Sequence, residues 1–148
     1  MTTIDQSATT IRELISSCRE AHEAFRSAAE AAGSSVLKQL FGLYAQQRSR
    51  FAEELRGFAT AELGTESQRP VSFLPFLGEA ELLESCLRRE KSAMALYRKA
   101  LAERTLPTKA HFLVSAQLAL LERVHYRIET LRPDARTAIL RTGERAMV

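Results

Sequence analysis

The segment LLERVHYRIE, residues 120–129, places a carboxylate and an imidazole three positions apart in a pattern typical of a helix. Residues three or four positions apart lie on the same side of a helix, so Glu122 and His125 could act on one point in space. Such a pair could serve two chemistries. A divalent ion would take the carboxylate oxygen and an imidazole nitrogen as ligands. A protein without a metal would use the same groups in a buried hydrogen-bonded network.

Other predicted helices also place polar groups on their apolar sides. At about 100° per residue, Glu90 and His22 lie near the centres of two apolar arcs, and Gln47 lies between Leu43 and Phe51 in a third. Two carboxylates and two imidazoles suit one zinc, iron or manganese ion. The predicted metal ligands are Glu90, Glu122, His125 and His22.

Two arginines beside Gln47 support the competing interpretation. A buried carboxylate is costly unless it is paired, and arginine offers it a permanently charged, bidentate partner. Arg48 or Arg50 would then neutralise Glu90 or Glu122. The predicted buried polar network consists of Gln47, Arg48, Arg50, Tyr44 and Tyr97. We expect this network rather than a metal ion, because an arginine pointing at Glu90 would exclude a cation by charge and by space.

Four amphipathic helices must position these residues. Apolar residues recur at intervals of three and four in four segments, at about residues 7–32, 36–63, 79–104 and 108–131. Gly33 separates the first two segments, TLPT separates the last two, and Pro133 follows the fourth. Gly57 is expected inside the second helix, where it costs some stability.

The lengths of the links predict the topology. Short links make each consecutive pair of helices an antiparallel hairpin. The link between the hairpins, GTESQRPVSFLPFLG at residues 64–78, is long enough at roughly 3.3 Å per residue to return along the bundle. We expect an all-α, antiparallel four-helix bundle with a crossover link. It would form a single domain over residues 1–132, followed by a C-terminal tail at residues 133–148.

Composition and charge exclude several classes of function. Charged residues of both signs alternate and the net charge is only +3, so nucleic acid is not an expected partner. No apolar run approaches the roughly 18 residues of a membrane span, and no leader pattern precedes the first helix. Cys18 and Cys86 stand among apolar residues, which predicts buried, reduced thiols in a cytoplasmic protein. A glycine-rich phosphate loop and a Cys-x-x-Cys motif are absent, which favours a protein that is not an enzyme.

Three stretches are informative in combination: LISSCREAHEAFRSAAE, LFGLYAQQRSRFAEEL, and CLRREKSAMALYRKAL with its Cys-x3-Glu. Together with an inward His125, they resemble a bacterial family of ferritin-like four-helix-bundle proteins of unassigned function, distantly related to ferritin and rubrerythrin. The resemblance covers about residues 10–132 and implies a crossover bundle without a known reaction. A full di-iron site of this kind needs Glu-x-x-His on two helices, and QQRSR stands where the second would be, so a di-iron centre is not expected.

Two hypotheses about function remain, and they belong to different classes. The first is a non-catalytic bundle whose buried polar layer derives from a degenerate metal site and which works by association. The alternative is a ferritin-like metalloprotein holding one iron, zinc or manganese ion, with a storage or oxidase-like role. A homo-oligomer would form through a face of the bundle or through the apolar loop at residues 73–77.

Overall fold

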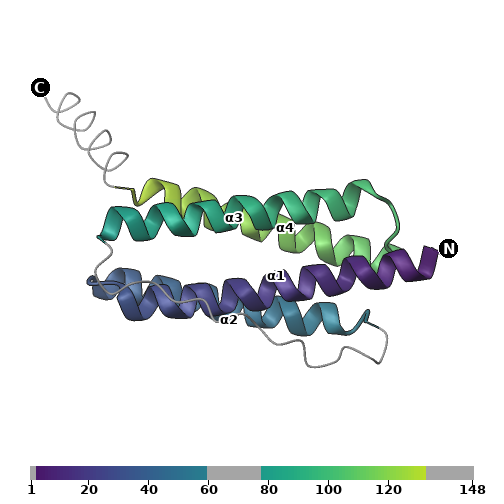
Figure 1. The fold of residues 1–148 in the computed structure, drawn as a ribbon, viewed down its shortest axis with the longest axis horizontal. Coiled ribbons are helices and arrows are strands. Elements are labelled where there is room, and N and C mark those ends of the chain that lie inside the picture. The colour runs from purple at the N-terminus through teal and green to yellow at the C-terminus, as the bar shows by residue number, and fades with distance from the viewer. Residues whose placement is uncertain (1–2, 60–77, 133–148) are drawn as a thin grey trace, which may run out of the picture.

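The computed structural model describes residues 3–59 and 78–132. Within these ranges the chain forms four α-helices and no strand, so the prediction of an all-α, four-helix protein is confirmed (Figure 1). The helices are α1 (Thr3–Ala31), α2 (Ser35–Arg56), α3 (Glu79–Ala102) and α4 (Thr108–Thr130). None of these helices is long and apolar enough to cross a membrane.

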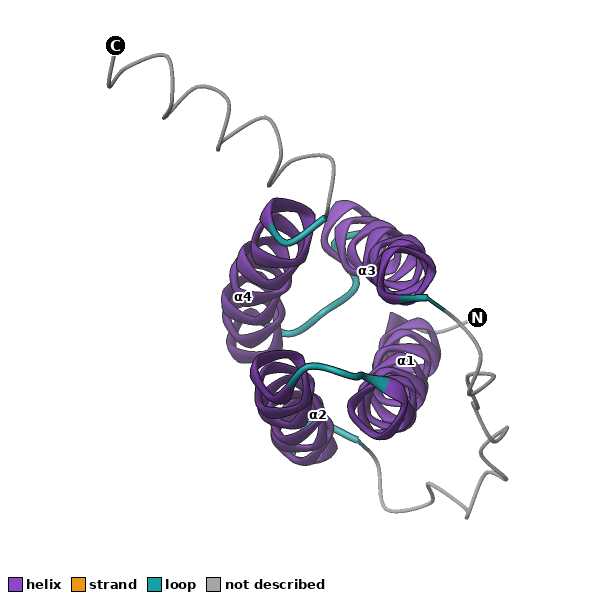
Figure 2. Cartoon of the chain, turned by 90° about the vertical axis from the view of Figure 1, so that its left-hand side faces the viewer, coloured by secondary structure: helices purple, strands orange, loops and turns teal. Residues whose placement is uncertain are grey.

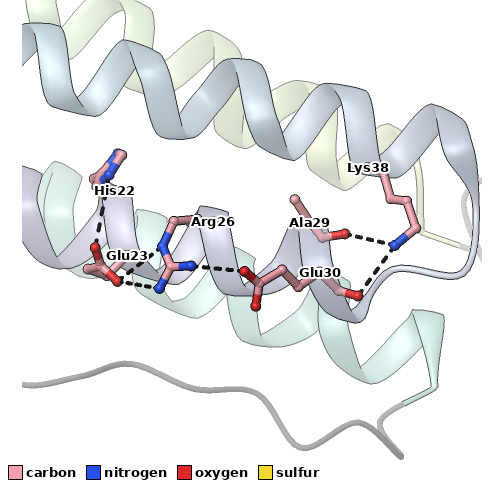
Figure 3. Close-up of polar contacts among 6 residues, drawn as sticks. All are labelled: His22, Glu23, Arg26, Ala29, Glu30 and Lys38. Atoms are coloured by element: carbon pink, nitrogen blue, oxygen red, sulfur yellow. Dashed lines mark hydrogen bonds and ion pairs between the residues drawn. The ribbon is translucent and has the colours of Figure 1, made fainter.

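The turn between α1 and α2 satisfies backbone groups at both helix ends. The Ser34 hydroxyl accepts a hydrogen bond from the backbone N–H of Leu37 at 3.4 Å, which caps α2. Figure 3 shows Lys38 reaching back across the turn. Its Nζ donates to the carbonyl oxygens of Ala29 and Glu30 at 3.2 and 3.3 Å, where α1 has no basic residue of its own in its last turn. The sequence GSS therefore closes a tight antiparallel hairpin.

Two layers of apolar side chains pack the hairpins together and fix the helix directions. One layer contains Cys18, Phe51, Tyr97 and Leu121, one from each helix in chain order. The other contains Phe25, Phe41, Leu83 and Ile128. From the first layer to the second, residue numbers rise along α1 and α4 and fall along α2 and α3. Hence α2 and α3 run in the same direction, as the colour gradient of Figure 1 also shows.

The end view in Figure 2 shows how the hairpins sit against each other. The helix α1 lies beside α2 and α3, and α4 completes the square beside the same two helices. The diagonal pairs are α1 with α4 and α2 with α3. A polar side chain at mid-height on α2 can therefore meet α3 only by reaching through the centre of the bundle.

Two details of α2 differ from the prediction. The helix ends at Arg56 instead of residue 63. At Gly57 and the two residues after it, each backbone N–H donates to the carbonyl three residues earlier instead of four, so Gly57 is the C-cap of the helix and not an interior residue. The buried side is also rotated: Leu43 is 62% exposed, whereas Phe41 and Ala45 are buried. Residues 60–63, the expected link as far as residue 77 with its 73–77 loop, and the tail at 133–148 lie outside the described residues.

Candidate functional site

Arg48 on α2 and Glu90 on α3 form a buried ion pair at the centre of the bundle. Each side chain is only 1% exposed. The Nη1 of Arg48 donates to Oε1 of Glu90 at 2.8 Å, and Nη2 donates to Oε2. This bidentate geometry uses both carboxylate oxygens, so the negative charge of Glu90 is neutralised by a fixed cation rather than left unpaired.

The rest of the guanidinium is also surrounded. The Cζ of Arg48 lies 5.4 Å from the ring centroid of Phe25 and 6.0 Å from that of Phe51. Its Nε donates to Oε1 of Gln47 at a long 3.5 Å. Aromatic faces attract a cation, and they do so more strongly where water is excluded. Three helices thus contribute to the surroundings of one arginine, and the layer has the charge balance that a buried ion requires.

A second polar layer joins all four helices. The hydroxyl of Tyr97 on α3 donates to Oε1 of Gln117 on α4 at 2.7 Å and lies 3.1 Å from Sγ of Cys18 on α1. The Nε2 of Gln117 donates to the backbone oxygen of Phe51 at 3.3 Å and to Oε1 of Glu54 at 3.4 Å, both on α2. The buried side chains of Tyr97, Gln117 and Cys18 all have partners in this layer, so the layer can hold the helices in one register.

The thiols and the phenol in these layers are held in their neutral forms. Burial raises the pKa of the Cys18 thiol to about 11, and the hydrogen bond with Tyr97 offsets only part of that rise. Burial also raises the pKa of the Cys86 thiol to about 12, with the charge of Glu90 adding to the effect. Burial and the neighbouring Cys18 raise the pKa of Tyr97 well above its usual range. Neither unpaired cysteine is therefore a thiolate nucleophile or a thiolate ligand near neutral pH.

His22 is partly exposed and bonds to the backbone of α2. Its side chain is 34% exposed, and Nδ1 donates to the backbone oxygen of Ala45 at 2.8 Å. Its Nε2 stands 4.0 Å from Oε1 of Glu23, the first member of an exposed ladder in which Arg26 pairs with Glu23 and Glu30 at 2.9 Å each (Figure 3). His22 therefore links α1 to α2 through the backbone.

Glu122 and His125 do not converge on one point. The Glu122 side chain is 51% exposed, and its Oε1 lies 3.7 Å from Nη2 of Arg98 on α3. The His125 side chain is 17% exposed, and its Nδ1 lies 3.8 Å from Oε2 of Glu129. Its Nε2 is buried and has no hydrogen-bond partner in the described part of the chain. Glu122 therefore turns toward Arg98 of α3 and the solvent, whereas His125 turns toward Glu129 in the next turn of α4.

The structure thus keeps some predicted residues together and separates others. Arg48, Glu90 and Gln47 form one layer, and Tyr97 lies in the adjacent one. Arg50 is exposed, while Tyr44 is half-buried with its ring 5.4 Å from Phe25 in an edge-on contact. The four predicted metal ligands are not brought together. Over residues 3–59 and 78–132, no three His, Cys, Asp or Glu side chains gather into a group that could hold a metal ion.

Gln117 belongs to the buried polar layer and was missing from the sequence prediction. The buried positions of α4 include Ala110, Val114, Leu121, Val124 and Ile128. Leu118 is buried as well and already completes the three-four spacing between Val114 and Leu121, and Gln117 stands next to it with 1% exposure. The usable signal is weaker: Gln117 lies three positions after Val114 and four before Leu121, so it shares the buried side of the helix.

A comparison of the sequence with models of known protein families finds no match. A comparison with curated proteins finds none either.

Proposed function

We propose that this chain is a non-catalytic, ferritin-like helical-bundle protein in which the Arg48–Glu90 ion pair takes the place of a metal ion. The observation that carries the proposal is the bidentate pair itself, with both side chains 1% exposed. A divalent ion would have to displace the guanidinium from both oxygens of Glu90 and would leave a buried cation beside it, which is strongly unfavourable.

The course of the helices supports the ferritin-like part of the proposal. Because α2 and α3 run in the same direction, Ala59 and Gly78 lie at opposite ends of the bundle (Figure 1). A connection that joins these ends has to span the length of the bundle, as a crossover does. In a simple up-down-up-down bundle α2 and α3 would run in opposite directions.

One observation favours the alternative, a metalloprotein with a single ion. The Nε2 of His125 is buried without a hydrogen-bond partner among the described residues, and an imidazole nitrogen in that condition is a donor that a metal could use. Glu122 precedes it by three positions but is half-exposed and engaged with Arg98. This alternative therefore has one donor in place, whereas the leading proposal has a complete ion pair.

Elemental analysis tests the proposal most directly. The protein would be purified without added metal or chelator, next to Glu90→Ala and next to Glu53→Ala, which removes an exposed carboxylate from α2 as a matched control. We expect wild-type protein that is folded with far less than one equivalent of iron, zinc or manganese, and a Glu90→Ala variant that is much less stable than Glu53→Ala. Near-stoichiometric metal that disappears in Glu90→Ala but stays in Glu53→Ala would overturn the proposal.

A further inference from the structure

The side of the bundle formed by α2 and α4 exposes apolar and basic residues together. Val36 and Leu43 on α2 are 63% and 62% exposed. At 100° per residue, both lie within about 20° of Glu54 around the helix axis. Glu54 contacts Gln117 of α4, so this side of α2 borders α4. Arg50 is exposed on the same side, within about 40° of Glu54.

The helix α4 supplies the matching flank. Glu122 of α4 contacts Arg98 of α3, and Arg127 lies about 140° from Glu122 around the helix axis, which places Arg127 on the side of α4 that borders α2. Leu120 and Arg123 lie within about 40° of Arg127 around the axis. Leu120 is half-buried, whereas both arginines are exposed. Figure 2 shows α2 and α4 next to each other along this side.

Six residues define what we call the basic–apolar surface: Val36, Leu43, Arg50, Leu120, Arg123 and Arg127. Glu54 is exposed on the same side of α2, so three arginines stand there against one carboxylate. Over the described ranges, neither Arg50 nor Arg123 has a carboxylate within ion-pair distance, unlike Arg26 and Arg98 elsewhere on the bundle. Unpaired guanidinium groups beside exposed aliphatic side chains are complementary to a partner that carries carboxylates beside its own apolar groups.

We propose that the basic–apolar surface binds an amphipathic helix of a partner protein, with an apolar stripe flanked by acidic residues. Val36 and Leu43 are seven positions, or about two helical turns, apart. Residues at this spacing form the contact points when a second helix packs along a helix. Leu120 is recessed beside α2, where a helical ridge reaches it and a flat lipid surface does not. If a second copy of this chain bound through the same surface, Arg50 and Arg123 of one copy would face the arginines of the other, and these like charges would repel.

This inference rests on the proposed non-catalytic role, because it assigns the means by which the bundle would associate. The two can fail separately. Elemental analysis of the purified protein decides whether the core holds a metal, and it does not depend on any partner. Binding of a helix to the α2–α4 side is measured on the same full chain, and it does not depend on the metal content.

Two synthetic peptides of about 21 residues, long enough for roughly six helical turns, serve as probes. They share leucines at helical spacing and differ only in their flanking residues, which are glutamate in one and lysine in the other. Binding of each labelled peptide to the full chain is followed by fluorescence anisotropy at low and high salt. Vesicles containing phosphatidylglycerol and sedimentation velocity of the protein alone test a lipid surface and a second copy as occupants.

Two pairs of variants locate the binding. Leu43→Glu is matched by Ala95→Glu, which changes an exposed apolar side chain on α3, and Arg123→Glu is matched by Arg12→Glu on α1. We expect the glutamate peptide to bind, and its affinity to fall about tenfold or more in Leu43→Glu and Arg123→Glu but not in either control. The lysine peptide should not bind. All four positions are exposed, so unchanged thermal melting should accompany the loss.

Several results would overturn the proposal. One is no binding of the glutamate peptide at any concentration reached. Another is an equal loss in Arg12→Glu and Arg123→Glu, which would mean attraction to net charge alone. Vesicle binding that is abolished by Leu43→Glu without peptide binding would assign the surface to lipid. A dimer that Leu43→Glu dissociates would assign it to a second copy.

Discussion

Arg48 and Glu90 stand 42 positions apart in the sequence and meet through two parallel hydrogen bonds in the interior of the bundle. The pair joins α2 to α3, which belong to different hairpins and lie diagonally across the bundle. No other buried ion pair is present in the described residues. We therefore expect its position to set the height at which one hairpin packs on the other, because a single buried polar residue can specify register in helical assemblies.

Removing one member of this pair should be far more damaging than removing both. Glu90→Leu leaves the Arg48 cation buried without a partner, and we expect a loss of about 3–5 kcal/mol in the free energy of unfolding. The double variant Arg48→Met/Glu90→Leu removes both charges at similar volume and should recover most of that loss. Urea denaturation of the two single variants and the double variant measures the coupling. Additive losses would contradict a specific pair.

The Tyr97–Gln117 hydrogen bond should behave in the same way on a smaller scale. Gln117→Leu leaves the buried Tyr97 hydroxyl with only the weakly bonding Cys18 sulfur, so we expect a loss of about 1–3 kcal/mol. Tyr97→Phe alone leaves Gln117 with its α2 partners and should cost less. Thermal denaturation monitored by circular dichroism compares them. A Gln117→Leu variant as stable as wild type would show that the layer does not contribute to stability.

Much of the fold could be predicted from the sequence, because apolar residues spaced three and four positions apart indicate amphipathic helices directly. The same spacing predicted that Glu90 points inward, and the chemistry of arginine narrowed its partner to Arg48 or Arg50. The spacing of apolar residues did not predict the buried side of α2 correctly. Arg48 is part of that buried side, but a hydrophobic pattern counts arginine as a polar, outward residue. Because Arg48 was counted as polar, the predicted buried side of α2 was shifted toward Leu43, which is exposed.

The grouping of Glu122 with His125 and His22 failed for a different physical reason. Residues that share one side of a helix point in directions that differ by tens of degrees, and the neighbouring helix decides which of them is covered. In α4 that difference leaves Glu122 half-exposed and His125 mostly covered. The end of α2 at Arg56 was equally hidden, since the sequence continues with helix-compatible residues after Gly57.

Stability should fall at alkaline pH through the two buried thiols. Their pKa values in the folded chain, about 11 for Cys18 and about 12 for Cys86, lie above the ordinary value of 9.0. The folded state therefore holds protons that the unfolded chain releases, so the contribution is complete below pH 9 and is lost as the pH rises through these values. Denaturation from pH 7 to pH 11 should show this decline. Cys18→Ala/Cys86→Ala should reduce it and leave the part that the raised pKa values of Tyr97 and Tyr44 contribute above their ordinary value of 10.0.

The same burial predicts inert thiols at neutral pH. The two cysteines belong to different apolar layers, Cys18 with Tyr97 and Cys86 with Leu83, so they should neither react quickly with a thiol reagent nor form a disulfide with each other. Reaction with an aromatic disulfide reagent before and after unfolding measures this difference. A Cys18–Cys86 disulfide that forms under mild oxidation would contradict the arrangement of the two layers.

The turn between α3 and α4 offers a position where a single substitution should stabilise the protein. Arg104 has a φ of 53°, in the left-handed region that an L-residue with a side chain adopts only at a cost of roughly 1–2 kcal/mol. Glycine adopts this conformation without that cost but loses more freedom on folding, by about 0.5–1 kcal/mol. Arg104→Gly should therefore raise the free energy of unfolding by up to about 1 kcal/mol. Arg104→Val, whose side chain is branched next to the backbone, should lower the free energy of unfolding. An Arg104→Gly variant that is less stable than wild type would contradict the prediction and mean that the arginine side chain makes a stabilising contact of its own.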